Sequence, residues 1–190
     1  MSRVKLCEVA REYKESWKGS KIGVPIVGLE HLIPEELLFN DYEVDTDNTF
    51  SKSFKKGHVL FGRRRAYQKK AALATIYGIC SGDITVIEAI PGKIDANLLP
   101  FIIQNADFFN YAISGSAGSL SPRVKWEHLA DFEFDLPSLS EQQVLAEKLW
   151  AAYNLKESYK KMIEATDEMV KSRFIEMFRG KPVNGKIEDI

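Results

Sequence analysis

The sequence predicts an α+β domain followed by one long α-helix that forms a coiled coil. The first 136 residues hold short apolar or alternating runs separated by Gly, Pro, Asn and Asp, which is typical of a domain with several strands. Residues 138–179 contain neither Gly nor Pro, as expected of a single helix. A chain of 190 residues that is 45% hydrophobic can bury one substantial core. We therefore divide the chain into a domain (1–136), a helix (137–180) and a linker or start of a second repeat (181–190).

Within the first domain, apolar runs bounded by turn residues are predicted to be strands. They are residues 23–29, 58–61, 72–77, 84–90 and 130–136. The run 98–113 instead has the length and the spacing of a helix that is buried on one side. Pro100 is tolerable there because it falls in the first turn.

The start and the end of the long helix carry recognisable signals. Ser140 is followed three residues later by Gln143, which predicts a capping box in which each side chain satisfies a backbone N–H. Leu139 and Val144 are placed for a hydrophobic staple across the same turn. Gly180 suits the position just after the last helical residue, where a positive φ favours glycine.

One face of this helix is predicted to bind a partner helix. Apolar residues recur along it at steps of three and four, interrupted only by Lys156 and Thr166. At 1.5 Å per residue the helix is on the order of 55 Å long and exceeds a domain width of roughly 30 Å. The alternative is a helix packed wholly on its own domain, but the length favours a coiled-coil partner. The predicted partner-helix residues are Leu145, Leu149, Ala152, Tyr159, Ile163, Val170, Phe174 and Met177.

A basic segment between Lys52 and Lys70 contains eight Lys or Arg residues and no acidic residue. Lysines neutralise phosphates, whereas Arg and Gln side chains can make bidentate contacts to base edges. The segment therefore indicates DNA binding, although a solvated edge strand guarded by cations is the alternative. The candidate DNA-binding residues are Lys55, Lys56, Arg63, Arg64, Arg65, Tyr67, Gln68, Lys69 and Lys70.

A second candidate is the loop 114–123, which is rich in Ser and Gly and ends on an arginine. It resembles a loop that a ligand can approach closely, and Ser116, Ser119 and Arg123 join the candidate DNA-binding residues. The Gly-Lys-Ser/Thr ending that holds a nucleotide phosphate is missing, so this is not a P-loop. A plain surface connection is the alternative.

Composition limits the classes of protein that remain. The 26 basic and 27 acidic residues give a net charge of -1, so any signal for nucleic acid has to be local. Cys7 and Cys80 are too few for a disulfide framework. Apolar runs of membrane-spanning length and a signal peptide are lacking, which predicts a cytoplasmic protein without a membrane partner. The three histidines lack zinc spacing, so we expect neither a metal nor a cofactor.

Enzyme functions are weakly supported. Asp83 and Glu88 suggest a metal-dependent nuclease, but the lysine expected two places after the glutamate is absent. They fit better at the ends of an ordinary strand. The glycine-rich cofactor loop and the catalytic motif of adenine methyltransferases are also absent. A coiled-coil adaptor without DNA binding is a further alternative, which leaves the basic segment unexplained.

Three stretches in order, residues 57–83, 136–142 and 172–178, together with residues 25–31, resemble the specificity subunit of type I restriction-modification systems. The resemblance implies a target recognition domain followed by a conserved helix, in a non-catalytic subunit that selects the DNA site. Separate modification subunits methylate adenine, and a restriction subunit cleaves.

Members of that family usually hold two such units and bind a bipartite site, whereas this sequence holds one. The resemblance therefore implies a half-length subunit that acts as a homodimer through its helix. Two-fold symmetry would then require two identical half-sites in inverted orientation. Residues 185–190 echo residues 4–9, as though a second copy of the unit began there.

Overall fold

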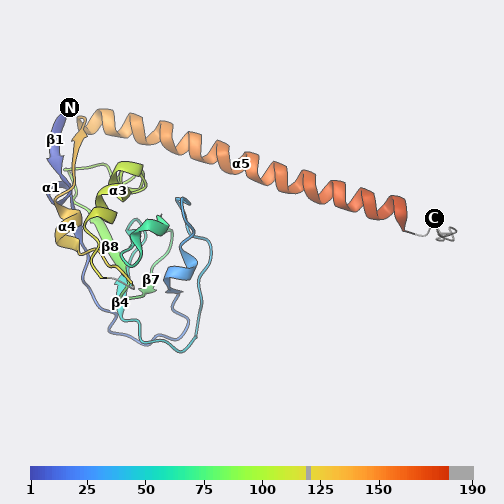
Figure 1. Ribbon diagram of the computed structural model, residues 1–190, viewed down its shortest axis with the longest axis horizontal. Coiled ribbons are helices and arrows are strands. Elements are labelled where there is room, and N and C mark those ends of the chain that lie inside the picture. The colour runs from blue at the N-terminus through green and yellow to red at the C-terminus, as the bar shows by residue number, and fades with distance from the viewer. Residues whose placement is uncertain (119–120, 180–190) are drawn as a thin grey trace, which may run out of the picture. The chain divides into compact units, whose positions relative to one another are not determined.

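The computed structural model describes residues 1–118 and 121–179. The chain divides into two compact units, Met1–Glu147 and Lys148–Ile190, and the boundary lies inside the long helix α5 (Leu139–Phe178). The predicted class, a mixed α+β domain followed by one long helix, is confirmed (Figure 1). The C-terminal echo at residues 185–190 and Gly180 lie outside the described residues.

The central sheet of the first unit is antiparallel and has the strand order β2-β8-β5-β6. These strands are β2 (Ala10–Glu12), β8 (Ile84–Ala89), β5 (Val59–Gly62) and β6 (Ala71–Leu73). Leu60 at the centre of β5 lies opposite Val86 on one side and Ala72 on the other. Every residue of β5 is buried, and the strand has a neighbour on each edge.

Two smaller sheets complete the domain. One has the order β3-β7-β4, with β3 (Ile26–Val27) parallel and β4 (Lys52–Phe54) antiparallel to β7 (Gly78–Cys80). The other pairs β1 (Ser2–Lys5) with β9 (Glu133–Leu136) in antiparallel register. The N-terminal strand therefore lies beside the strand that leads into α5.

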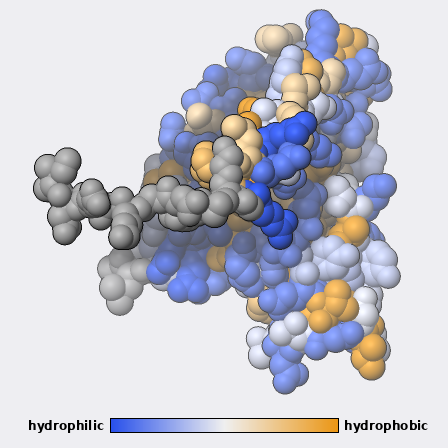
Figure 2. All heavy atoms as spheres, turned by 90° about the vertical axis from the view of Figure 1, so that its right-hand side faces the viewer, coloured by the Kyte–Doolittle hydropathy of each residue, from blue (hydrophilic) through white to orange (hydrophobic). Residues whose placement is uncertain are grey.

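Short helices connect and cover these strands. The α-helices are α1 (Leu6–Val9), α2 (Leu99–Ile103), α3 (Ala106–Ser114) and α4 (Trp126–Ala130), and the 3-10 helices are η1 (Leu29–His31) and η2 (Ala66–Gln68). Phe108 and Phe109 of α3 pack on Phe61 of β5, with ring centroids 5.6 and 5.8 Å away. Large apolar groups gather in this core, and hydrophilic residues predominate on the face drawn in Figure 2. The core fixes α3 against the end of β5.

Two of the five predicted strands, 58–61 and 84–90, are confirmed as β5 and β8 with shifts of one residue at their ends. The strand predicted at 72–77 is wrong in its second half, because the chain turns at residues 74–77 and passes into another sheet at β7. The predictions at 23–29 and 130–136 were too long, since only β3 and β9 are strand and residue 130 ends α4. The very short β1, β2, β4 and β7 were missed.

The single helix predicted at 98–113 is wrong, because the structure has α2 and α3 with a break between them. Asn105 has an extended backbone (φ -66°, ψ 144°), and its side chain accepts a hydrogen bond from Asp107 N. This is an N-cap, which begins a new helix. The side chain of Gln104 is also engaged elsewhere, donating to the Glu36 and Ala71 carbonyls.

The predicted start of α5 was displaced by two residues. The helix begins at Leu139, and Ser138 donates from its N–H and its Oγ to Glu141 Oε2 at 2.9 and 2.7 Å. The Ser138–Glu141 pair thus replaces the predicted Ser140–Gln143 capping box. The predicted staple is also wrong, because Leu139 is itself the first residue of the helix and does not precede its N-cap.

The buried residue of this first turn is Gln142, which is 1% exposed. Its Oε1 accepts from Asp95 N at 2.8 Å, and its Nε2 donates to the Pro137 carbonyl at 2.9 Å. One side chain therefore satisfies two backbone groups and fixes the start of α5 to its own domain.

We expect Gln142→Ala to lower the free energy of unfolding by about 2 to 3 kcal/mol, because two backbone groups lose their partner and a small cavity forms. Gln143→Ala is the matched control, since the neighbouring glutamine is exposed and should change stability by less than about 0.5 kcal/mol. Urea unfolding of both variants measures the difference. Equal stabilities would mean that the Gln142 hydrogen bonds contribute nothing.

Candidate nucleic-acid interface

The three consecutive arginines lie in the connection between β5 and β6, directly after the buried Gly62. Arg63 N donates to the Asp83 carbonyl at 2.9 Å, which extends the pairing of β5 with the β8 side of the sheet. β5 has β8 on one edge and β6 on the other, so the arginines do not belong to an exposed edge strand. The arginines therefore do not guard an edge strand, whereas Lys52 opens the edge strand β4 and Lys70 directly precedes the edge strand β6.

The middle of this connection is the short turn η2, which is bracketed by two left-handed residues. Arg65 and Lys69 have φ of 54° and 51°, a conformation that costs a non-glycine residue roughly 1 kcal/mol. Arg65 N donates to the Pro122 carbonyl at 2.8 Å, and Lys69 N donates to the Ala66 carbonyl at 2.9 Å. These bonds hold a turn in which Arg65 and Tyr67 are exposed, Tyr67 at 55%.

The Ser- and Gly-rich loop lies directly beside the arginines. Ala117 and Arg123 exchange backbone hydrogen bonds of 3.0 and 2.9 Å, and Val124 N donates to the Arg63 carbonyl at 3.0 Å. Gly118 has φ 110°, which glycine adopts without strain. The two candidate segments, which are some fifty residues apart in sequence, thus form one surface.

The serines of this loop make different contacts. Ser116 Oγ donates to the Ala112 carbonyl at 3.2 Å, so this hydroxyl satisfies the last turn of α3. Ser119 lies outside the described residues. Ser121, which sequence reasoning did not select, accepts a hydrogen bond from Arg64 Nε.

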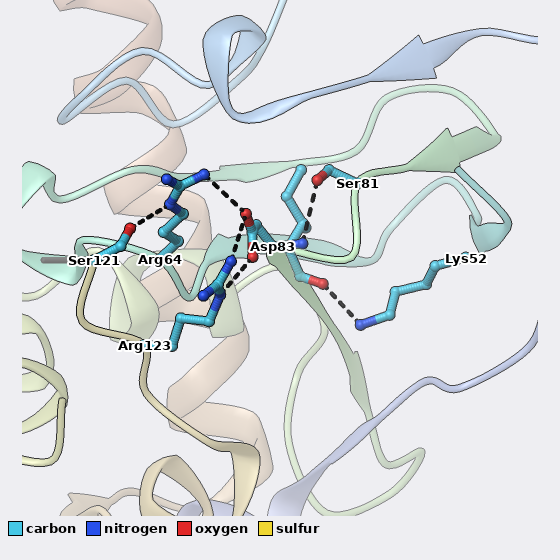
Figure 3. A network of polar contacts seen from close by, with 7 residues as sticks. Lys52, Arg64, Ser81, Asp83, Ser121 and Arg123 are labelled. Carbon is cyan, nitrogen blue, oxygen red and sulfur yellow. Dashed lines mark hydrogen bonds and ion pairs between the residues drawn. The ribbon is translucent and has the colours of Figure 1, made fainter. Parts of the chain in front are cut away.

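A carboxylate joins the two segments (Figure 3). Arg123 Nε and Nη2 donate to the two Asp83 oxygens at 2.8 and 3.4 Å, and Arg64 Nη1 donates to Asp83 Oδ2 at 3.4 Å. The hydrogen bond from Arg123, aided by the charges of both arginines, lowers the pKa of Asp83 below its ordinary value. Asp83 is therefore ionised near neutral pH. The segment 52–70 has no acidic residue of its own, but the fold places this carboxylate beside its arginines.

The four candidate lysines of the basic segment divide into two groups. Lys55 and Lys56 precede β5, whereas Lys69 and Lys70 follow the arginines, so roughly 13 Å of strand separates the groups. Lys55 Nζ lies 5.1 Å from the centre of the Tyr13 ring. Lys69 Nζ pairs with Glu35 at 3.4 Å, and Lys70 Nζ donates to the Leu29 carbonyl at 2.7 Å. The single basic surface expected from the sequence is thus two regions at opposite ends of β5.

The two acids considered for a nuclease do not form one site. Asp83 and Glu88 are five residues apart on an extended chain, a separation of roughly 16 Å. Glu88 pairs with Arg11 at 2.8 Å and faces His58 Nε2 at 3.7 Å. Over residues 1–118 and 121–179, three or more His, Cys, Asp or Glu side chains nowhere gather as metal ligands would.

The long helix α5 presents a broad row of apolar side chains. Most of the predicted partner-helix residues are exposed: Leu145, Tyr159, Ile163, Val170, Phe174 and Met177 at 40 to 64%, and Ala152. Leu149 is half-buried. Leu155, Met162 and Met169, spaced by seven, form a second exposed row that the sequence reasoning missed. Among the helices of the described ranges, none combines the length and the apolar composition needed to cross a membrane.

The chain belongs to the family of type I restriction modification DNA specificity domains, whose model matches residues 9–165. It is similar to the type I restriction enzyme EcoDI specificity subunit of Escherichia coli, with 22% identity over 177 residues. That alignment covers 91% of this chain and 36% of the relative. The family resemblance expected from the sequence is confirmed.

Solved structures share the fold. One is a chain from a study of complex assembly and conformational transition of the type I R-M system. It matches with a TM-score of 0.70 and 18% identity, and the match covers 99% of this chain and 51% of that one. The HsdS subunit from Thermoanaerobacter tengcongensis has a TM-score of 0.68 and 19% identity, with 96% and 51% covered. The chain therefore spans about half the length of these structures, or less in the case of the E. coli relative.

Proposed function

We propose that the chain selects a DNA sequence for a type I restriction-modification complex in which partner subunits methylate adenine and cleave. The observation that carries this proposal is the Arg64–Asp83–Arg123 network, which joins the basic connection and the Ser- and Gly-rich loop. We call the exposed and half-buried residues around Asp83 and η2 the arginine surface. It consists of Arg63, Arg64, Arg65, Tyr67, Gln68, Lys69, Ser121 and Arg123. Family membership supports the same function.

Different residues of the arginine surface would have different roles. Arg65 directly precedes the turn η2 and Gln68 ends it. The two donors of the Arg65 guanidinium suit guanine in the major groove, whereas the Gln68 amide, which both donates and accepts, suits adenine. Lys69 and the more distant Lys55 and Lys56 would contact phosphates, which gives affinity without sequence information. Tyr67, which is exposed, would make apolar contact with bases or sugars. Lys70 supports the connection from inside through the Leu29 carbonyl.

We further propose that two copies of the chain pair through α5. The row that contains Tyr159, Ile163, Val170 and Phe174 would form the contact between copies, because burying such side chains stabilises helix pairs. The matched structures are about twice as long, so two copies would supply a similar amount of structure. A symmetric pair would read two inverted half-sites. The second row, with Met162 and Met169, remains available to a modification subunit.

Co-expression with modification subunits tests the function directly. Sequencing that detects methylated adenine should find modification at one inverted-repeat motif when the chain is present, and none with the modification subunits alone. Methylation at the same positions without the chain would contradict a role in site selection. A stable complex that methylates no defined motif would favour the adaptor alternative.

A further inference from the structure

We infer that Asp83 is a positioning residue for sequence discrimination, which holds two arginines of the arginine surface in place and weakens binding to unrelated DNA. This inference rests on the proposed function and assigns a role to a residue that does not itself need to touch a base. Three observations support it. Hydrogen bonds hold the backbone around Asp83, its two carboxylate oxygens bind arginines from two different segments, and its negative charge offsets theirs.

The backbone around Asp83 is held on both sides. Asp83 N donates to Ser81 Oγ at 3.2 Å, and Ile84 N donates to the Ser81 carbonyl at 3.0 Å, so the turn before β8 is closed. The Asp83 carbonyl accepts from Arg63 N, and the Ile84 carbonyl accepts from Lys52 Nζ at 2.8 Å (Figure 3). The carboxylate therefore projects from a turn that hydrogen bonds hold directly before β8.

Its two oxygens hold arginines from different segments. Arg123 contacts both oxygens, whereas Arg64 contacts Oδ2 and also Ser121 Oγ. The Asp83 side chain is only 21% exposed, but those of Arg64 and Arg123 are 39% and 48% exposed. Each guanidinium keeps further N–H donors outside this network, so it can be oriented by Asp83 and still bind an external acceptor.

The charge balance explains why a negative group helps discrimination. Two arginines alone would attract any phosphate backbone, whatever its sequence. The ionised Asp83 cancels one of these charges and repels phosphates, and its hydrogen bonds fix side chains that otherwise have many rotamers. Fixed donors favour the DNA that matches their positions, whereas mobile cations bind phosphates of all sequences nearly equally.

The test is Asp83→Asn in the chain assembled with its modification subunits. Binding is measured to a duplex that carries the mapped motif and to the same duplex with the motif scrambled, over a series of salt concentrations. We expect affinity for the scrambled duplex to rise severalfold, with a log–log salt slope steeper by about one, because one phosphate-repelling charge is lost. Affinity for the motif should fall, so that the ratio of the two affinities drops by about tenfold or more.

Two further variants make the result specific. Asp83→Glu keeps the charge but displaces the oxygens, so it should keep the weak binding to scrambled DNA and still lose affinity for the motif. Asp131→Asn removes the same charge from a different ion pair, in which Asp131 Oδ1 lies 2.8 Å from Lys5 Nζ. It should leave the ratio of motif affinity to scrambled-duplex affinity unchanged. An unchanged ratio in Asp83→Asn would overturn the inference, and so would an equal fall of both affinities, which indicates a structural defect. If the wild-type complex prefers no motif, it is the proposed function that fails.

Discussion

Replacing Arg63, Arg64 and Arg65 together by Ala is expected to abolish sequence-specific DNA binding and to leave the fold and partner assembly intact. The three residues form one side of the arginine surface, and each bidentate contact to a base contributes about 1 to 3 kcal/mol of discrimination. Affinity for the mapped motif should therefore fall by at least about a hundredfold. Fluorescence anisotropy with labelled duplexes measures this, and thermal unfolding checks the fold.

A charge-matched control separates position from net charge. Lys18, Lys21 and Lys93 are three cations outside the arginine surface, and their joint replacement by Ala removes the same charge. This control should retain the preference for the motif. The wild-type chain should also show steep salt dependence, with a log–log slope of roughly -5 if about six phosphates are contacted. Unaltered duplex affinity in the arginine variant would refute the DNA-binding role of this surface.

The second large effect is expected in α5. Leu149→Asp combined with Ile163→Asp places two carboxylates in the row through which two copies are proposed to pair, and Ile163 is 62% exposed in the single chain. Burying unpaired charges in a helix interface costs more than such a pairing supplies. Light scattering should show dimers for the wild-type chain and monomers for the variant.

The matched control introduces the same charges on the opposite face of α5. Asn154→Asp and Ser158→Asp alter two exposed polar residues and should leave the dimer intact. Circular dichroism of both double variants checks that the helix is retained. A wild-type chain that is already monomeric without its partners would refute pairing through this row.

Much of the fold could be predicted from the sequence, where local pattern decides structure. β5 is a continuous apolar run, β8 is apolar apart from Thr85 and Glu88, and α5 has no Gly or Pro over its whole length, so both kinds of element were identified. Strands of two to four residues such as β1 and β7 were missed, because distant partners stabilise them and their own composition does not. The break at Asn105 was missed because a single capping side chain outweighed a helical apolar pattern.

The candidate site shows the same division. Arg63 to Arg65 could be selected as candidate DNA-binding residues because they are consecutive in the sequence. Asp83 could not be assigned its place, since its contact with Arg123 spans forty residues of sequence and depends on how two loops meet. The separation of Lys55 from the arginines also follows from the direction of β5, which a charge count does not record.

The ladder between β1 and β9 has a consequence for engineering. Lys5 lies opposite Glu133, and Leu6 N donates to the Phe132 carbonyl at 2.9 Å, so the chain enters and leaves the domain at neighbouring points. We therefore expect that the polypeptide between these two residues can be exchanged as a unit, because backbone hydrogen bonds already join its two ends. Transplanting a related segment between Lys5 and Glu133 would replace the arginine surface and keep the ladder and α5 as a common frame.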